Sequence, residues 1–434
     1  MPAASVFEAP MQWLYEILFT LGYLAYIPGA LLRKRLPHAG WTMRLGRYPQ
    51  AILENLRGSK NIWVHAVSVG EVLSSRPLLN ALADRKPQDK RIVSSITPGG
   101  FSLAERYVQK QGVAIYWPFD LTVCTERALA ALRPRLLILM ESELWPTMIR
   151  QARIRGVPVV VVNGRMSERT FRRYRRFRSL FNGMASSINQ FLMQSKLDAD
   201  RLTGLGVDPR KVIVTGNMKW DASAAAKPSP QEVQARKAQL GLSDAIPLVV
   251  AGSTHRGEEE AVLDAWQALQ NKARPVRLIV APRHLERLEE VERLILRRGA
   301  GCARLSSLAP NQPWQIGLVD TFGQLPCYYA LAGVVFIGGS LIPHGGQNPV
   351  EASSQAKPVV FGPHMHNFSD IARQLLERQA CIQVPDKNAL SGALRGLLED
   401  KARAKAMGER AERLTEESCG ATRKTVDALE PYLA

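Results

Sequence analysis

The chain has 434 residues, of which 46% are hydrophobic and 22% are charged. This composition excludes an intrinsically disordered protein, and the length indicates roughly two or three domains. The formal net charge of +18 indicates an anionic partner, such as phosphate-rich lipid, nucleotide or nucleic acid. The five cysteines are odd in number and have no paired spacing, which excludes a disulfide framework and a zinc cluster and favours a reducing compartment.

The first predicted element is the apolar segment MQWLYEILFTLGYLAYIPGALL (residues 11–32), in which Glu16 is the only charged residue. It is long enough to cross a hydrocarbon core of about 30 Å. Basic residues 33–35 follow it and none precedes it, so we expect a membrane anchor rather than a secretory signal, with the rest of the chain in the cytoplasm. A spanning helix, a hairpin, a helix in the membrane interface and a helix buried in the soluble body all stay open, because Glu16 and Pro28-Gly29 interrupt the apolar run.

Residues 61–193 alternate between apolar runs of strand length and amphipathic segments of helix length. The strands are continuous apolar runs, which is typical of a parallel sheet covered by helices on both faces. We therefore predict a doubly wound α/β domain. The predicted strands are 62–67, 91–96, 113–117, 136–140, 157–162 and 190–193, and the predicted helices include 101–111, 122–132 and 144–156.

The segment TFRRYRRFRSLF (residues 170–181) predicts a single helix with aromatic residues at near-helical spacing and arginines between them. Two interpretations are equally consistent with it. One is a stripe of core residues beneath a solvated basic face, and the other is a surface that contacts anionic head groups.

The alternation pauses at residues 218–232, an Ala/Ser/Pro-rich stretch typical of an interdomain linker, and then begins again. We therefore predict an anchor over residues 1–36, a Rossmann-like domain over 37–222, a linker over 223–232 and a second Rossmann-like domain over 233–434, with its last helix able to return to the first domain. The second set of predicted strands is 247–251, 276–281, 317–319, 334–337, 358–361 and 381–384, and the helices include 285–298, 349–354, 370–378 and 389–399.

Charged residues follow several of these strands, and ligands of open parallel sheets bind at the carboxyl ends of the strands. Glu71 follows the first strand and the turn Ser68-Val69-Gly70, at the start of a helix. It is either an acid that complements the helix dipole or a catalytic carboxylate. Glu141 and Glu143 follow the strand that ends at Met140.

The segment HGGQNPVEAS (residues 344–353) is the most specific motif in the second half of the chain. Its two adjacent glycines permit close approach of a ligand, Asn348 can cap a helix, and Pro349 suits the first helical position, where backbone amides attract a phosphate. Glu351 is placed to accept hydrogen bonds from ribose hydroxyls, and Arg283, after a neighbouring strand, offers a fork for the phosphate. Asn-Pro-x-Glu by itself is also a competent capping sequence.

The sequence has no Cys/His cluster with the spacing of metal ligands, so we expect no metal and no cofactor. Asp198-Ala199-Asp200 matches a short acidic pattern that holds divalent ions in some sugar transferases. It falls in a predicted helix, where residues i and i+2 face apart, so we interpret it as a solvated helix start.

Nine motifs resemble, in their order along the chain, those of the 3-deoxy-D-manno-octulosonic acid (Kdo) transferases. They are HAVSVGE, MESELWP, TGNMKWD, STHRGEE, PRHLER, DTFGQL, GGS, GGQNPVEA and FGPHMHNF. The resemblance implies a GT-B glycosyltransferase fold, a CMP-Kdo donor, inversion at the sugar and no metal. It implies a lipid A precursor (lipid IVA) as acceptor in lipopolysaccharide biosynthesis, and an enzyme at the cytoplasmic face of the inner membrane whose basic surface meets anionic lipid.

Transferred position by position, the resemblance implies a general base at Glu71 and transition-state stabilisation by Glu141 and Lys219. The chain departs from the family pattern at Gln347, where relatives often carry His, and at His344, where relatives often carry a basic residue, so the roles of those residues do not carry over. The implied CMP contacts are Pro282, Arg283, Phe322, Gly323, Gln324, Asn348, Pro349, Val350 and Glu351.

A base at Glu71 answers a chemical need, because a sugar hydroxyl is a poor nucleophile at neutral pH. We expect the helix dipole to keep the pKa of Glu71 from rising far, so that the side chain stays ionised. The convergence of the other motifs on strand ends favours this catalytic interpretation over the capping one.

Two other functions are kept as alternatives. A UDP-sugar transferase or epimerase of the same fold would bind UDP rather than CMP. A basic membrane-tethered nucleic-acid binder would bind DNA or RNA with steep salt dependence. The sequence contains no recognisable nucleic-acid module and has two glutamates in MESELWP, so we expect no nucleic-acid partner.

Overall fold

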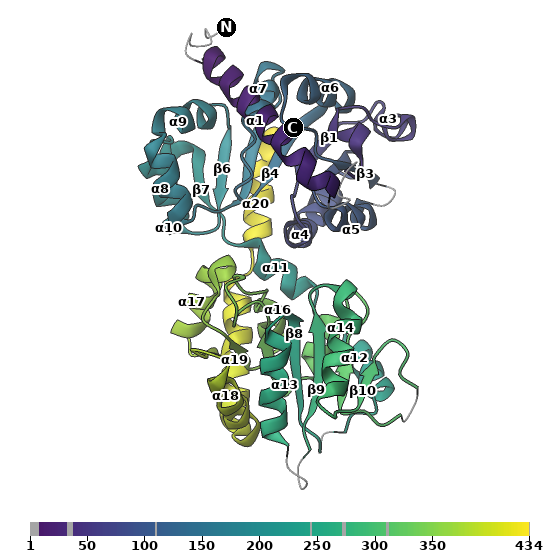
Figure 1. Ribbon diagram of the computed structural model, residues 1–434. Coiled ribbons are helices and arrows are strands. Elements are labelled where there is room, and N and C mark those ends of the chain that lie inside the picture. Colours follow the sequence, from purple (N-terminus) through teal and green to yellow (C-terminus); the bar gives the residue numbers. More distant parts are fainter. Residues whose placement is uncertain are drawn as a thin grey trace. The chain divides into compact units, whose positions relative to one another are not determined.

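A computed structural model of the chain describes residues 8–32, 38–108, 111–243, 245–270, 275–309 and 312–433. The chain divides into two compact units (Figure 1). The first comprises Met1–Ala222 and Cys419–Ala434, and the second comprises Ser223–Ser418. Each unit contains one seven-stranded sheet in which all the strand pairs are parallel.

The sheet of the first unit has the strand order β3-β2-β1-β4-β5-β6-β7. The order reverses between β1 and β4, and this switch point is where ligands of doubly wound sheets bind. The strands are β1 (Asn61–His65), β2 (Lys90–Ser95), β3 (Gly112–Tyr116), β4 (Pro134–Met140), β5 (Val159–Gly164), β6 (Gln190–Met193) and β7 (Val212–Val214).

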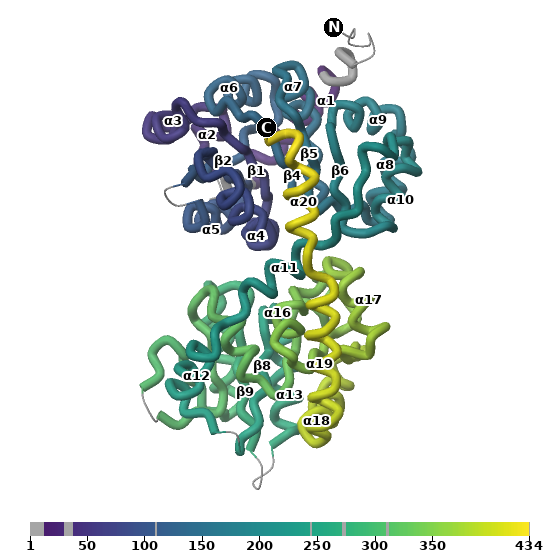
Figure 2. Tube along the Cα trace, turned by 180° about the vertical axis from the view of Figure 1, so that it is seen from behind, coloured from purple at the N-terminus to yellow at the C-terminus, as the bar shows by residue number. Residues whose placement is uncertain are grey.

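Helices cover this sheet, and the last helix of the chain is among them, packed on α4 (Figure 2). Arg85 of α4 forms an ion pair of 2.9 Å with Asp427 of α20. The helices that belong to or border this unit are α1 (Glu8–Leu32), α2 (Trp41–Arg44), α3 (Gln50–Leu56), α4 (Val69–Arg85), α5 (Pro98–Val108), α6 (Thr122–Leu132), α7 (Pro146–Ile154), α8 (Glu168–Arg176), α9 (Arg178–Ser186), α10 (Lys196–Gly204), α11 (Met218–Ala225) and α20 (Ala421–Leu429).

The central strands are buried on both faces, which explains their continuous apolar sequences. In β1, Trp63 packs into one core together with Phe191 of β6. Its neighbours Ile62 and Val64 point the other way and pack with Leu78 of α4 in a second core. Successive side chains of a strand alternate between faces, so a strand covered on both sides needs apolar residues throughout. The predicted doubly wound α/β fold is confirmed.

The second unit repeats this architecture with the strand order β10-β11-β9-β8-β12-β13-β14, and its switch point lies between β8 and β12. The strands are β8 (Leu248–Thr254), β9 (Arg277–Pro282), β10 (Cys302–Arg304), β11 (Ile316–Leu318), β12 (Val334–Ile337), β13 (Val359–Phe361) and β14 (Cys381–Gln383). The helices are α12 (Pro230–Gln239), α13 (Glu258–Leu269), α14 (Leu288–Arg297), α15 (Leu325–Leu331), α16 (Val350–Ser353), α17 (Ser369–Glu377), α18 (Asn388–Glu399) and α19 (Lys401–Ser418).

The prediction of one helix over residues 170–181 is wrong. Helix α8 ends before Phe177 and α9 begins after it, and the Phe177 ring is 57% exposed. Phe171 and Tyr174 pack against the core, and Phe181 is buried in it. The break lets Tyr174 stack on Phe181 with ring centroids 4.6 Å apart, so all the aromatic residues of this segment except Phe177 are core residues.

Helix α1 is held on the first unit by polar contacts from its own side chains. The Tyr15 hydroxyl donates to the buried Asp120 carboxylate at 2.9 Å, and Glu16 accepts from the Thr122 hydroxyl at 2.5 Å. No helix in the described ranges is both long enough and apolar enough to cross a membrane. The basic run 33–35, on which the predicted orientation rests, lies outside the described residues.

Candidate active site

Glu71 lies in the first turn of α4, directly beyond the end of β1. The Ser68 hydroxyl caps this helix, accepting from the Glu71 amide at 3.4 Å and donating to the Glu71 carboxylate at 3.0 Å. The Val67 amide donates to the other carboxylate oxygen at 2.9 Å. The two bonds to the carboxylate fold it back towards the end of the strand, so Glu71 is both a capping residue and an acid fixed at the sheet edge.

The charge state of Glu71 is set by two opposing groups of interactions. Burial raises its pKa most, followed by the negative charge of Glu141, while the hydrogen bonds from Val67 and Ser68 lower it; the result is a pKa of about 7. The expectation that the helix dipole would keep this pKa from rising far is therefore wrong. A pKa near 7 is nevertheless the value that suits a general base at neutral pH.

Glu141 directly follows β4, across the switch point from Glu71. Its backbone has a φ of 55°, in the left-handed region that a side chain with a Cβ rarely adopts. Lys219, in the first turn of α11, forms an ion pair of 2.8 Å with it, and the two side chains are only 16% and 15% exposed. The structure thus gathers the three predicted catalytic residues in one unit, and the strained backbone at Glu141 is typical of a functional position.

The amide side chains of Asn163, Asn217 and Gln194 position Lys219. These three residues were not predicted from the sequence. The Asn163 side chain, at the end of β5, accepts from the Met218 amide at 2.9 Å. The Asn217 side chain accepts from the Lys219 amide at 3.0 Å and donates to Gln194 at 3.0 Å. Asn163 also has a left-handed backbone, with a φ of 55°. The only signal for Asn217 in the sequence is the motif TGNMKWD.

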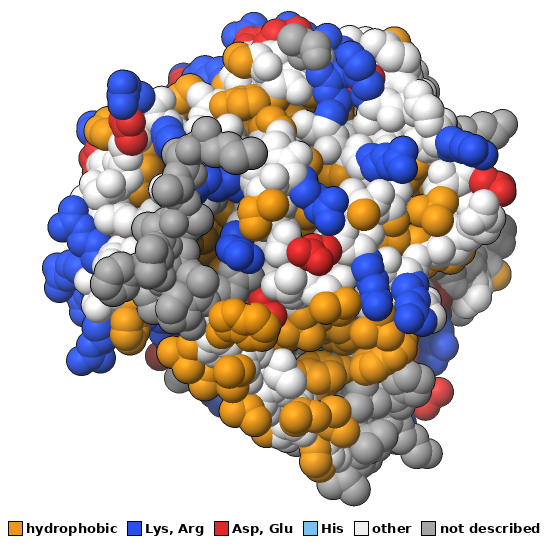
Figure 3. All heavy atoms as spheres, turned by 90° about the horizontal axis from the view of Figure 1, so that it is seen from above, with side chains coloured by type: hydrophobic (Ala, Val, Ile, Leu, Met, Phe, Trp, Pro, Cys, Tyr) orange, Lys and Arg blue, Asp and Glu red, His pale blue; other side chains and the backbone are white. Residues whose placement is uncertain are grey.

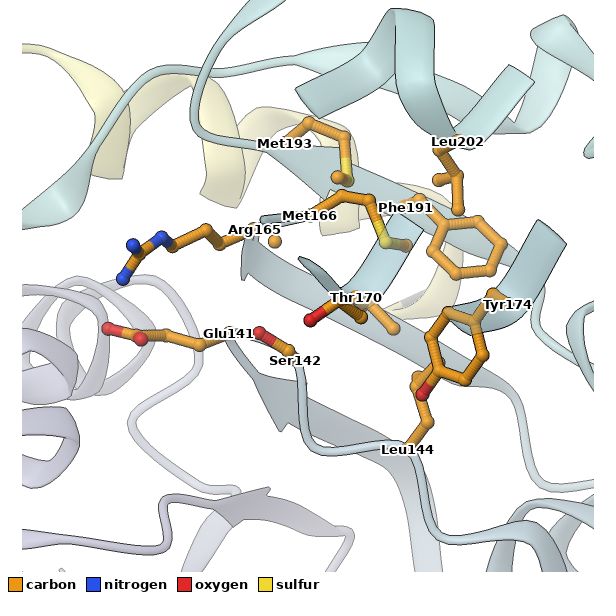
Figure 4. Close-up of a pocket in the computed structure, with 12 residues that line it drawn as sticks. Glu141, Ser142, Leu144, Arg165, Met166, Thr170, Tyr174, Phe191, Met193 and Leu202 are labelled. Carbon is orange, nitrogen blue, oxygen red and sulfur yellow. The ribbon is translucent and has the colours of Figure 1, made fainter. Parts of the chain in front are cut away.

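A pocket opens beside Glu141 within the first unit (Figure 4). Glu141 and Arg165 point to the same side of it, and the aromatic and sulfur-containing side chains lie on the other. Arg165 follows β5 and therefore adds a guanidinium to this edge of the sheet, which the sequence analysis also missed. The lining residues are Glu141, Ser142, Leu144, Val161, Gly164, Arg165, Met166, Thr170, Tyr174, Phe191, Met193 and Leu202.

The second unit places Asn348, Pro349, Val350 and Glu351 at the start of α16. The Asn348 side chain accepts from the Val350 amide at 3.1 Å and donates to the Glu351 carboxylate at 3.2 Å. Helix α16 begins at Val350, one residue after the predicted start. Burial raises the pKa of Glu351, whereas the Asn348 bond and the charge of Arg283 lower it.

The other predicted CMP contacts occupy two further strand ends. Pro282 ends β9 and Arg283 follows it, with its amide donating to the Thr254 carbonyl at 2.9 Å. Phe322 and Gly323 form a turn before α15, in which Phe322 is 65% exposed and Gly323 has a φ of 81°. The side chain of Gln324 accepts a hydrogen bond from Arg236 of α12.

Glu258 organises the loop after β12 and was not recognised in the sequence. Its buried carboxylate accepts from the amides of Gly339 at 2.6 Å, Ser340 and Leu341 at 2.9 Å, and His255 at 3.0 Å. These four bonds hold the Gly-Gly-Ser turn against the end of β8. The motif STHRGEE contains this residue, but a role in binding a distant turn has no local sequence signal.

Within the described ranges, no group of three or more His, Cys, Asp or Glu side chains is arranged to hold a metal ion. Asp198, which was expected to be solvated, is buried and accepts from the Met166 amide at 2.8 Å. Asp200 forms an exposed ion pair of 3.0 Å with Lys196.

Comparison with known proteins gives a family match within the first unit and relatives that cover most of the chain. Residues 39–222 match the family model of 3-deoxy-D-manno-octulosonic-acid transferase (kdotransferase). A 3-deoxy-D-manno-octulosonic acid transferase of Bordetella pertussis is 36% identical over 86% of this chain and 87% of its own. The transferase of Haemophilus influenzae is 33% identical over 86% of this chain and 87% of its own.

Solved structures of other sugar-nucleotide enzymes share the fold. UDP-GlcNAc 2-epimerase from Neisseria meningitidis aligns with 86% of this chain and 100% of its own, with a TM-score of 0.60 and 13% identity. A glycosyltransferase from Rickettsia africae aligns with 87% of this chain and 99% of its own, with a TM-score of 0.59 and 12% identity. These likenesses establish the GT-B-type arrangement and say nothing of the substrate. Because identity above 30% extends over most of both chains, the chain belongs to the 3-deoxy-D-manno-octulosonic acid transferases and is a glycosyltransferase.

Proposed function

We propose that this enzyme transfers Kdo from CMP-Kdo to a hydroxyl of a lipid A precursor, with inversion at the sugar, in lipopolysaccharide biosynthesis. Family membership supports the transfer of Kdo. The observation that carries the proposed mechanism is the half-buried carboxylate of Glu71, whose pKa of about 7 lets it exist as a base at neutral pH. Its relatives in the family are named as transferases of the same sugar.

The first unit activates the acceptor. The acceptor hydroxyl attacks the anomeric carbon of Kdo, the bond from that carbon to the phosphate of CMP breaks, and CMP leaves with the electron pair. Glu71 takes the proton from the attacking oxygen. Lys219 and Glu141 adjust the local charge as the transition state forms. The charge of Glu141 acts on Glu71, and the ion pair that Glu141 makes with Lys219 is largely shielded from water.

The second unit binds the nucleotide of the donor. Asn348 and the amides at the start of α16 approach the ribose and phosphate, Glu351 accepts from a ribose hydroxyl, and Arg283 binds the phosphate. Pro282 and the turn of Phe322, Gly323 and Gln324 contact the base. The bond from Asn348 to Glu351 supports this assignment, because it fixes the carboxylate before the ligand arrives.

We also propose that the enzyme works at the cytoplasmic face of the inner membrane, with α1 lying in the interface. Trp13, Leu14 and Leu18 of α1 are exposed, although they are large and apolar. Figure 3 shows a face of the molecule on which apolar side chains gather beside Lys and Arg side chains. Such a surface suits anionic lipid and the phosphates of the acceptor.

Nucleotide binding by the purified full-length protein tests the donor assignment. By isothermal titration calorimetry we expect CMP to bind more tightly than UDP. We expect Arg283→Ala to weaken CMP binding by about 1.5–3 kcal/mol, the value of a hydrogen bond to a charged group. Preference for UDP would favour the alternative function of a UDP-sugar enzyme, and unchanged CMP affinity in Arg283→Ala would refute the phosphate role of that residue.

A further inference from the structure

Three histidine rings from three different loops meet at the switch point of the second sheet. We call His255, His284 and His344 the imidazole cluster. The ring of His344 lies over that of His255 with centroids 3.9 Å apart, and the ring of His284 meets His255 edge-on at 5.6 Å. His255 is buried, with 7% of its surface exposed, whereas His344 and His284 are open to solvent.

The cluster is surrounded mainly by positive or potentially positive groups. Burial lowers the pKa of His255 most, and His344, His284, Arg283 and Arg287 add to the effect; together they bring it to about 4. The pKa of His344 is lowered by burial and then by His284, Arg283 and His366. The free protein therefore holds these two rings in the neutral form at pH 7.

The acidic groups nearby are already engaged. Glu286 lies 3.5 Å from the His284 ring, at the solvent side of the cluster. Glu258 lies beneath His255, but its carboxylate is occupied by four backbone amides, one of them that of His255 itself. An anion that bound beside His255 and His344 would therefore find two neutral imidazoles. Its charge would favour protonation of these rings.

The side chain of Gln347 can form a hydrogen bond with His255 whether the imidazole is neutral or protonated. Its side-chain nitrogen lies 3.0 Å from Nε2 of His255. An amide nitrogen only donates, so in this arrangement Nε2 of His255 accepts and the ring proton sits on Nδ1. When the ring takes up a second proton, a half-turn of the amide presents its oxygen to Nε2–H and keeps the hydrogen bond.

We propose that the imidazole cluster binds the carboxylate of the donor sugar and takes up a proton as it does so. The inference rests on the proposed function, since that donor is an acid as well as a nucleotide. Arg283 links the two parts of the site because its charge acts on Glu351 and also on His255 and His344. A ligand whose ribose is held at Glu351 and whose phosphate is held at Arg283 therefore extends its next group towards the cluster.

The test varies His344, which is exposed and so can be replaced without loss of the fold. We measure the KM for CMP-Kdo, kcat and the dissociation constant of CMP for the full-length protein, His344→Gln and His344→Arg at several pH values. In His344→Gln we expect the KM for the donor to rise about tenfold, with CMP affinity unchanged. His38→Gln, in the first unit, is the control and should match the wild type.

The pH profile separates a carboxylate site from a merely structural role. Binding an anion raises the pKa of the His255 and His344 rings, so donor binding takes up protons. It should therefore weaken as the pH rises above the pKa values of the free protein, which are about 4 for His255 and below the ordinary value for His344. In His344→Arg the cation is permanent, so the donor KM should stay low and lose most of that pH dependence.

Two results would overturn the inference. In the first, His344→Gln keeps the wild-type donor KM and pH profile. In the second, it weakens CMP and CMP-Kdo by the same factor, which would assign the cluster to the phosphate. Failure of the proposed function itself gives a different result, in which the wild-type protein neither binds CMP nor transfers Kdo.

Discussion

The carboxylate of Glu71 combines two roles that the sequence presents as alternatives. It completes the cap of α4 through Ser68 and Val67, and it is half-buried within the electrostatic reach of a second carboxylate, Glu141. A residue that served only as a cap would gain stability by remaining solvated and ionised. The raised pKa of Glu71 thus lowers stability near neutral pH, as is common for catalytic groups.

Glu71→Gln should reduce the rate of Kdo transfer by about 10²–10⁴ at saturating donor, because it keeps the shape of the side chain and removes the base. CMP binding should not change, since its contacts lie in the other unit. The matched control is Glu54→Gln, an exposed acid of α3.

Thermal melting of the same variant separates catalysis from capping. The pKa of Glu71 is raised on folding from 4.5 to about 7, so its contribution to stability is complete below pH 4.5 and is lost as the pH rises through 7. Glu71→Gln should therefore melt no earlier than the wild type at pH 8. A variant that is destabilised by about 0.5–1 kcal/mol and still transfers Kdo at nearly the normal rate would return Glu71 to the role of a cap.

The pH dependence of Kdo transfer should follow the ionisation of Glu71, and it should shift when Lys219 is replaced. We expect kcat/KM to rise with pH through about 7 as Glu71 ionises. Lys219→Ala leaves Glu141 without its cation, so the greater negative charge should move this rise to higher pH by roughly one unit. An acidic limb at the same pH in both proteins would contradict the coupling between the ion pair and Glu71.

The candidate site residues that follow the ends of strands could be predicted from the sequence. Glu141 and Arg283 stand directly after strands that the apolar runs define, and Glu71 follows such a strand after a short turn, so their position at a sheet edge follows from the sequence. Lys219 lies in a stretch that reads as a linker, and only the family resemblance indicates it. Asn163 could not be found in this way, because its partner Met218 is 55 residues away along the chain.

Among the secondary-structure elements, the central strands of each sheet could be predicted from the sequence, and the edge strands β7 and β10 could not. Strands β7 and β10 were missed because each has only three residues. The apolar run of β7 is too short to stand out, and β10 ends in a charged residue, Arg304. The division of residues 170–181 into α8 and α9 was missed for another reason. Helical spacing of aromatic residues continues across Phe177, and only the packing of Tyr174 on Phe181 requires the break.

Helices α1 and α8 should together bind the enzyme to anionic membranes. The full-length protein should sediment with vesicles containing phosphatidylglycerol more strongly than with neutral vesicles, and salt should weaken binding. Replacing Arg173, Arg175 and Arg176 by Glu should lower the affinity at least roughly 100-fold, at about 1 kcal/mol for each basic residue near the surface.

The control for this experiment reverses an equal number of charges elsewhere. Lys401, Arg403 and Lys405 lie on α19 in the second unit, and their replacement by Glu changes the net charge by the same amount. Equal losses in the two triple variants would mean that net charge, rather than the surface of α8, drives membrane binding.

At the scale of the whole molecule, the fold and the function are separate conclusions. Two doubly wound sheets are shared with an epimerase at 13% identity and a glycosyltransferase at 12% identity, so the architecture predicted from strand alternation does not choose a reaction. The choice comes from the ordered motifs at the strand ends and from relatives with 33–36% identity. The net charge of +18 agrees with an anionic donor, acceptor and membrane without selecting among them.

The most direct measurement is the mass of the acceptor after reaction. Purified full-length protein is incubated with freshly generated CMP-Kdo and a tetra-acylated lipid A precursor in detergent, and the lipid is analysed by mass spectrometry. The account predicts a lipid heavier by one or more whole Kdo residues, formed with release of CMP, and almost none of it with Glu71→Gln. An acceptor of unchanged mass with active donor, or the same yield from Glu71→Gln as from the wild type, would contradict it.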